Sequence, residues 1–181
     1  MSQINVNTIA NASGTSAASI DSNGILTPTK IAQSVAFQVR GSDSDFAYTA
    51  ASGVTHLTGW NEIELNVGSC WSNANQQFTP TVAGWYMFGG SVRFQCPSTV
   101  AYISMEIAKN NDYNNGTGLK TQYQYGADTI TNSEFVAPTG LLYCNGSTDY
   151  VEIFIDCDEN ITVHDSSVRK SHFFGFLVHA T

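Results

Sequence analysis

The sequence predicts an all-β fold, a sandwich or jelly roll of about ten short strands, and three observations support this prediction. Apolar and polar residues alternate with a period of two in many short segments, which is typical of strands with one buried face. Turn-forming Gly, Asn and Pro residues separate these segments. Aromatic residues make up 12% of the 181 residues and no helical period of useful length appears, so a β-rich core is expected.

Two strands are predicted ahead of the most apolar part of the chain. The first covers residues 34–40, where the odd-numbered positions are apolar. The second covers residues 61–67, where aliphatic side chains alternate with Glu62, Glu64 and Asn66. Because charged side chains favour water, the Glu face is expected to point outward and the aliphatic face inward.

The densest apolar segment, residues 78–88, follows a polar loop and starts the next strand. Successive side chains of a strand point to opposite faces. Tyr86 and Phe88 therefore share one face, and Trp85 and Met87 share the other. Since both faces are apolar, this strand is expected to be covered on both sides.

Further strands are predicted over residues 92–96, 101–108 and 150–156, each with an alternating pattern. In the last two, aliphatic side chains form the inward face. The side chains expected to face outward are Tyr102, Ser104 and Glu106 in the first of these two strands, and Tyr150, Glu152 and Phe154 in the second.

The last strand, residues 171–178, is apolar on both faces. One face covers the interior, and the other carries Phe174, Phe176 and Val178. Burying a Phe side chain stabilises a protein by about 1.5–3 kcal/mol, so several that are exposed together form an adhesive patch. We therefore expect these three side chains to lie in an interface between subunits.

Part of the sequence resembles the signature of the C1q and tumour-necrosis-factor-like head domain. The residues at its spacings are Trp60, Asn66, Trp71, Phe78, Gly84, Tyr86 and Phe88. Two positions depart from the signature, because Trp60 stands where Phe is usual and Gly90 where a last aromatic is usual. The resemblance implies a ten-stranded jelly roll over residues 34–181 that assembles as a homotrimer and uses its loops for recognition.

Residues 1–33 differ from the rest, since they are rich in Ser, Thr, Asn, Ala and Gly and contain no aromatic residue. Such a segment buries too little apolar area to fold alone, so an extended anchoring arm held by a neighbouring subunit or by a second protein is predicted. Its apolar residues Ile4, Val6 and Ile9 suit a strand added to a partner's sheet edge. Residues 6–15 resemble the openings of structural proteins of tailed bacteriophages, particularly of cyanobacterial and marine hosts.

The charge composition argues against two classes of partner. The net charge is −8 and the pI is near 4.7, whereas nucleic acids and anionic membranes both attract basic surfaces. The N-terminus lacks the basic and apolar regions of a secretion signal, so assembly in the host cytoplasm and location in the virion are expected. In that compartment the four cysteines, at positions 70, 96, 144 and 157, are expected to be free thiols.

One candidate metal site is the acidic group Asp156, Asp158 and Glu159, whose oxygens suit calcium. Its spacing matches no EF-hand loop, so a solvated loop with no metal or other cofactor is the preferred interpretation.

One candidate ligand site is the group Tyr113, Tyr123 and Tyr125, which lies among amides and hydroxyls. Tyr and Asn side chains are typical of binding loops. Tyrosines that cap the core or the trimer seam explain the same pattern equally well.

No nucleophile motif, phosphate loop or catalytic set of titratable residues is recognisable, so a non-enzymatic function is expected. The preferred hypothesis is a phage virion surface protein whose trimeric head serves as a tail-fibre or receptor-binding module that adheres to a host-surface glycan or protein. One alternative is a capsid decoration, or cement, trimer that stabilises the phage head. Another is a free bacterial C1q-like lectin.

Overall fold

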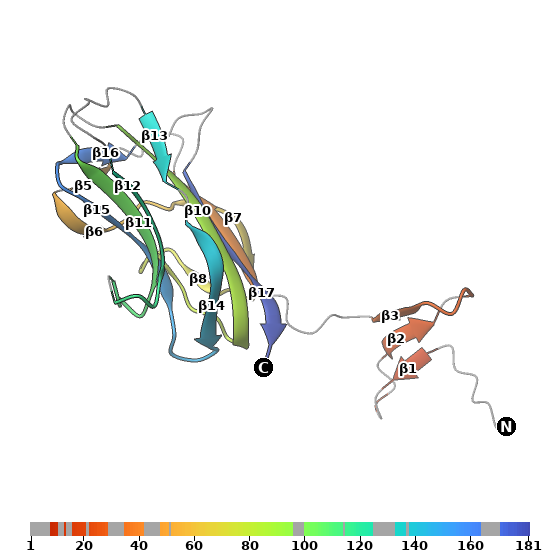
Figure 1. The fold of residues 1–181 in the computed structure, drawn as a ribbon. Helices are drawn as coiled ribbons and strands as arrows, with labels where there is room; N and C mark the ends of the chain where they lie inside the picture. Colours follow the sequence, from red (N-terminus) through yellow and green to blue (C-terminus); the bar gives the residue numbers. More distant parts are fainter. Residues whose placement is uncertain are drawn as a thin grey trace. The chain divides into compact units, whose positions relative to one another are not determined.

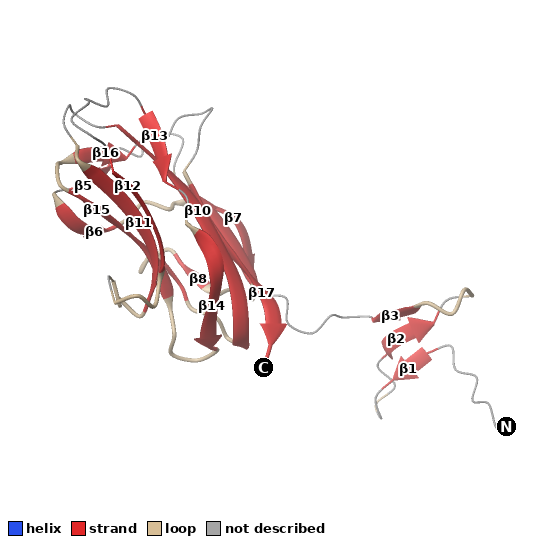
Figure 2. Cartoon of the chain, in the orientation of Figure 1, coloured by secondary structure: helices blue, strands red, loops and turns tan. Residues whose placement is uncertain are grey.

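The computed structural model describes residues 8–10, 13, 16–20, 22–28, 35–41, 48–50, 52–95, 100–113, 115–124, 133–136, 138–163 and 171–181. The chain divides into two compact units, Met1–Ser34 and Val35–Thr181. Strands and loops account for all the described residues, as Figure 2 shows, and no helix among them is long and apolar enough to cross a membrane.

The N-terminal unit contains a three-stranded antiparallel sheet in the order β1 (Thr8–Ala10), β2 (Ser16–Ile20) and β3 (Leu26–Pro28). The prediction of an extended arm is therefore corrected, because these residues pair with one another. Asn23 and Gly24 lie in the turn between β2 and β3. Gly24 has a φ of 77° there, which glycine adopts without a steric penalty. Ile9 is 47% exposed in β1, whereas the predicted anchors Ile4 and Val6 lie outside the described residues.

The larger unit, called the head here, is a sandwich of two antiparallel sheets (Figure 1). The β10 sheet has eight strands in the order β5-β16-β10-β17-β4-β7, with β13 and β14 also paired to β10. Their bounds are β4 (Ala36–Arg40), β5 (Tyr48–Ala50), β7 (Glu62–Val67), β10 (Ala83–Gln95), β13 (Ser133–Val136), β14 (Thr139–Asn145), β16 (Ile161–Val163) and β17 (His172–Ala180).

The β15 sheet has six strands in the order β12-β11-β15-β9-β8, with β6 also paired to β15. Their bounds are β6 (Gly53–His56), β8 (Trp71–Ser72), β9 (Gln77–Phe78), β11 (Tyr102–Lys109), β12 (Leu119–Gln124) and β15 (Val151–Cys157). The strand predicted to start within residues 78–88 and the strand predicted at residues 92–96 are one strand, β10, whereas Phe78 belongs to β9 and Cys96 lies outside the described residues. The first half of β10 pairs with β14 and its second half with β13.

Aromatic rings form the core between the sheets. Phe37 lies at the centre, with ring centroids 4.5 Å from Phe78 and 4.7 Å from Phe173. Most of the signature residues gather here, because Trp60, Trp71, Phe78, Tyr86 and Phe88 are all buried. The signature glycine has a packing reason as well, since a Cβ on Gly84 would lie 2.3 Å from the backbone oxygen of His179.

Two polar side chains hold the loops that enter this core. The Asn66 Oδ1 accepts a hydrogen bond of 3.0 Å from the backbone N–H of Trp71. The Gln76 Oε1 accepts hydrogen bonds from the backbone N–H groups of Gly59 and Trp60, at 2.9 and 2.7 Å. Buried backbone donors without such acceptors are costly, which explains the signature asparagine.

The cysteine prediction is confirmed where it can be followed. Cys70 and Cys144 are buried free thiols, and Cys157 is buried as well. Burial raises the pKa of Cys144 to about 12. Cys96 lies outside the described residues.

Two predictions about strand faces are wrong. In β7 the aliphatic side chains are exposed, and Asn66 points inward to Trp71. On the outer face of the β15 sheet, Ser104, Glu106 and Glu152 are buried instead of facing water. The His56 side chain of the paired strand β6 and Tyr113 of the turn after β11 lie on this face, since both contact the ring of Phe154.

Candidate functional site

The side chains of β17 alternate between the core and the outer face of the β10 sheet. Phe173 is fully buried, and Leu177 packs against the core. Phe174 is partly exposed, while Phe176 and Val178 are 45% and 54% exposed. The three predicted interface residues therefore share one outward-facing row.

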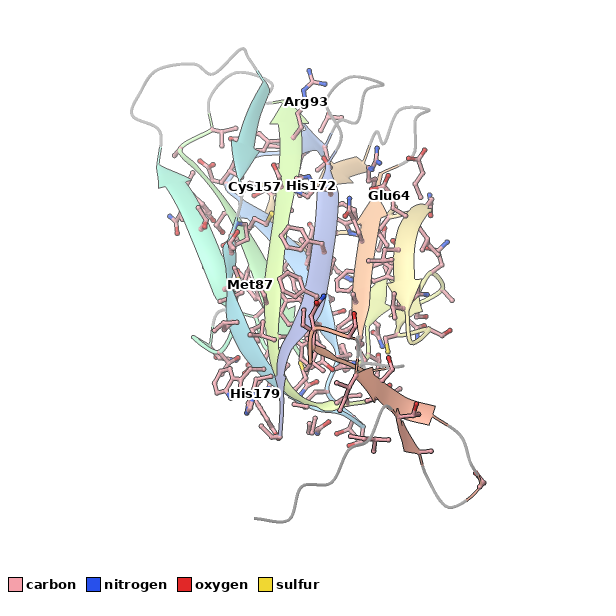
Figure 3. All side chains as sticks on the ribbon, turned by 90° about the vertical axis from the view of Figure 1, so that its right-hand side faces the viewer. Glu64, Met87, Arg93, Cys157, His172 and His179 are labelled. Atoms are coloured by element: carbon pink, nitrogen blue, oxygen red, sulfur yellow. The ribbon has the colours of Figure 1, made fainter. Side chains whose placement is uncertain are left out.

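The register of the neighbouring strands extends this row across the sheet. Phe176 lies opposite Met87 of β10 and opposite Ala36 of β4, and Ala36 in turn lies opposite Val67 of β7. Figure 3 looks onto this side of the head, where Met87 projects from the middle of β10. One continuous outer face thus runs over β14, β10, β17, β4 and β7.

This outer face is strongly apolar at both flanks. On the β14 flank, Trp85, Leu141 and Tyr143 are between 39% and 50% exposed. On the β7 flank, the exposed side chains are Ile63, Leu65 and Val67, at 46%, 43% and 36%. We call this surface, with Phe174, Phe176, Val178 and Met87 at its centre, the apolar face. Among the described residues, the large apolar side chains exposed elsewhere are Ile9, Ile25 and Val54.

A groove of about 430 Å³ lies at the β14 flank. Its apolar wall includes Trp85 and Tyr143, whose rings meet edge to face with centroids 5.8 Å apart. Its polar lip comes from the turn after β11 and includes Lys109, Asp112 and Thr117. Hydrogen bonds from Asn115 and Thr117 lower the pKa of Asp112, so the lip carries an anion beside the Lys109 cation.

Of the three predicted ligand-binding tyrosines, the structure describes the side chain of Tyr113. The Tyr113 hydroxyl donates to Asp156 Oδ2 at 2.9 Å, and its ring lies against Phe154 and beneath the Lys120 ammonium. Burial of the Tyr113 hydroxyl raises its pKa, and the neighbouring Asp156 carboxylate raises it further. Tyr123 belongs to β12, not to a loop, and Tyr125 lies outside the described residues.

The acidic candidate site is used by the chain itself. Asp156 accepts hydrogen bonds from the hydroxyls of Tyr102 and Tyr113, at 3.2 and 2.9 Å. Both oxygens of Asp158 accept from the backbone N–H of Ala101 at 3.0 Å. Glu159 is exposed. In the described parts of the chain, no group of three His, Cys, Asp or Glu side chains is placed to hold a metal ion.

The sequence reasoning missed the β7 flank of the apolar face, although a signal for it was present. Asn66 and Trp71 both belong to the head-domain signature, which places Asn66 at the core. Residues two apart in a strand share a face, so an inward Asn66 turns Leu65 and Val67 outward. The charge of Glu64 favoured the opposite assignment, with the Glu side of β7 in water. That carboxylate instead forms an ion pair with Arg40 and accepts a hydrogen bond from the Gln38 amide.

The sandwich and its apolar face define the jelly-roll architecture of C1q and tumour-necrosis-factor head domains. Three solved structures share this architecture with the chain. One is the globular domain of zebrafish complement 1qA, with a TM-score of 0.55 and 14% identity over 81% of this chain and 99% of that one. The second is an Eiger TNF from S. frugiperda, with a TM-score of 0.62 and 12% identity over 82% and 94%.

The third is murine APRIL, with a TM-score of 0.53 and 10% identity over 81% of this chain and all of that one. At these identities the likeness shows the fold alone. No protein-family model matches the sequence, and no curated protein matches it.

Proposed function

We propose that this chain is a non-enzymatic surface protein of a tailed-phage virion, with a trimeric head that acts as a tail-fibre or receptor-binding module. The observation that carries the proposal is the apolar face, which extends over five strands. A face with this many exposed Phe, Trp, Leu and Ile side chains is unfavourable in water and marks an interaction surface. Its size and position fit association with further copies of the head.

The two flanks of the apolar face favour a closed ring of subunits. One flank is aromatic, around Trp85 and Tyr143, and the other is aliphatic, around Leu65. Contact between two different patches on identical subunits is heterologous, and it closes into a ring when the rotation permits. The resemblance to C1q and tumour-necrosis-factor heads supplies the number three. The groove then belongs to the seam between neighbours.

The virion assignment rests on the N-terminal unit. Residues 6–15 resemble the openings of tailed-phage structural proteins, and the unit is too small for independent stability, since short sheets are marginal in water. We place its partner among the other virion proteins. The absence of enzymatic activity is part of the same proposal, because the acidic side chains Asp156 and Asp158 serve as hydrogen-bond acceptors for the chain itself.

Mass measurement by light scattering on the purified protein tests the subunit contact. Phe176→Asp places a charge at the centre of the apolar face and is expected to give monomers or aggregates. Val54→Asp is the matched control, since Val54 is also 45% exposed but lies on β6 of the other sheet. A stable, well-folded trimer of Phe176→Asp would contradict the proposed contact.

Counting copies in purified particles tests the virion role. A receptor-binding module predicts a few trimers per tail. Hundreds of copies per particle would instead indicate a capsid decoration protein. Glycan binding by a protein that is found in no particle would support a free lectin.

A further inference from the structure

A buried carboxylate lies on the outer face of the β15 sheet, the sheet opposite the apolar face. Glu152 of β15 is only 5% exposed, and its Oε2 lies 3.3 Å from Nε2 of His56 on the adjacent strand β6. The Glu152 Oε1 is also buried and has no hydrogen-bond partner among the described residues. A buried carboxylate with one unpaired oxygen is unfavourable, so binding of a proton by the pair stabilises this arrangement.

Burial acts on the two members of the pair in opposite directions. It raises the pKa of Glu152 above its ordinary value of 4.5, against a hydrogen bond from the Asn111 backbone that lowers it. It lowers the pKa of His56 below its ordinary value of 6.5, against a hydrogen bond to the Gln76 backbone that raises it. Both shifts disfavour the charged form, as expected where water is excluded.

The groups that surround the pair are mainly acidic. Glu106 of β11 is 2% exposed, and Asp156 lies further along β15. Tyr150, just before β15, has a raised pKa because of burial and then because of the Glu152 charge. Tyr113 has a raised pKa too, with Asp156 and Glu106 contributing after burial. Lys120 of β12 supplies a cation 5.6 Å above the Tyr113 ring.

The pair lies beneath the turn between β11 and β12. The turn begins with Asn110 and Asn111, which both have a φ of 58°. The Phe154 ring links the pair to this turn, because its centroid is 5.3 Å from the His56 ring and 5.7 Å from the Tyr113 ring. The same turn carries Asp112 and Thr117, which form the lip of the groove.

We propose that His56 and Glu152 form a proton-operated latch for the β11–β12 turn. With one shared proton, the pair has no net charge and the turn stays seated on β15. Loss of that proton leaves a bare buried carboxylate, and uptake of a second leaves a buried imidazolium beside a carboxyl group that accepts poorly from Asn111. Either change loosens the turn, and with it the lip of the groove.

The two pKa shifts give the latch a two-sided pH dependence. The His56 contribution is complete above pH 6.5 and is lost as the pH falls through its lowered folded pKa. The Glu152 contribution is complete below pH 4.5 and is lost as the pH rises through its raised folded pKa. Between pH 4.5 and pH 6.5 neither contribution is complete and the two change in opposite directions, so each is expected to show by itself only when the other group is removed.

Amide hydrogen exchange of residues 110–113 in the full chain, expressed as protection factors across pH 4 to 8, tests the latch. In the wild type the two slopes oppose each other between pH 4.5 and pH 6.5, and each is at most about tenfold per pH unit, the limit for one proton. Glu152→Gln should lose protection only on the acid side. His56→Gln should lose it only on the alkaline side.

Tyr102→Phe is the matched control on the same face, because it removes a hydrogen bond to Asp156 but leaves the pair intact. It should keep the pH profile of the wild type. Parallel profiles in the wild type and Glu152→Gln would overturn the latch, since a structural role alone lowers protection equally at every pH. Glu152→Gln keeps the shape of the side chain, so this comparison decides the matter even if His56→Gln does not fold. The latch stands whether or not three heads associate.

Discussion

At Gly175 the packing of the core leaves no room for a side chain. A Cβ there would lie 2.6 Å from the ring of Phe88 and 2.7 Å from the ring of Phe37. The glycine therefore lets β17 approach the aromatic centre of the head, although glycine normally weakens a strand. Its place in a strand of otherwise bulky residues is a consequence of the size of the rings that face it.

Replacing this glycine tests that account. Gly175→Ala should destabilise the head by about 1–3 kcal/mol, the usual cost of overpacking a core. For a protein of this size the melting temperature should then fall by roughly 2–4 °C per kcal/mol, measured by thermal unfolding. Val54→Ala, at an exposed position of β6 outside the apolar face, is the control and should change the melting temperature much less. An unchanged melting temperature for Gly175→Ala would show that the rings move aside.

At the scale of the strand, variants of β7 test whether its aliphatic face is exposed or belongs to the core. Leu65→Asp places a charge on a side chain that is 43% exposed, so the head should remain folded while its association is lost. Val39→Asp is the contrasting variant, because Val39 of the adjacent β4 is fully buried, and it should prevent folding. Circular dichroism and light scattering distinguish the two outcomes. An unfolded Leu65→Asp would restore the interpretation in which the aliphatic face of β7 is core.

The strands also show how far the sequence predicts this fold. Alternation gave the correct faces for β10 and β17, because aromatic side chains there are too large to be placed ambiguously. In β7 the decisive information is a hydrogen bond, from the Trp71 backbone to Asn66, which polarity alone does not reveal.

The burial of Glu106 and Glu152 could not be predicted from the sequence for another reason. Their strands were found correctly and their outward direction was correct. The side chains of His56 on β6 and Tyr113 in the β11–β12 turn cover this face. Contacts between segments far apart in sequence leave no periodic signal. The latch pair shows this most clearly, since His56 and Glu152 are nearly a hundred positions apart and meet only across two paired strands.

At the scale of the whole chain, the two units are expected to have separable roles. The aromatic core, the apolar face and the latch all lie within Val35–Thr181. Deleting residues 1–33 should therefore leave a folded head that still associates, because all of these features are retained. The same deletion should abolish incorporation into particles, since the N-terminal unit is the proposed anchor.

Two measurements on the truncated chain check these expectations separately. Light scattering and thermal unfolding report on the head, whose melting temperature should rise with protein concentration, as for any folded state stabilised by association. Copy number in particles assembled with the truncated chain reports on the anchor. Incorporation at the normal level would make the anchoring role wrong without affecting the subunit contact, whereas a monomeric truncated head would mean that the N-terminal unit itself takes part in association.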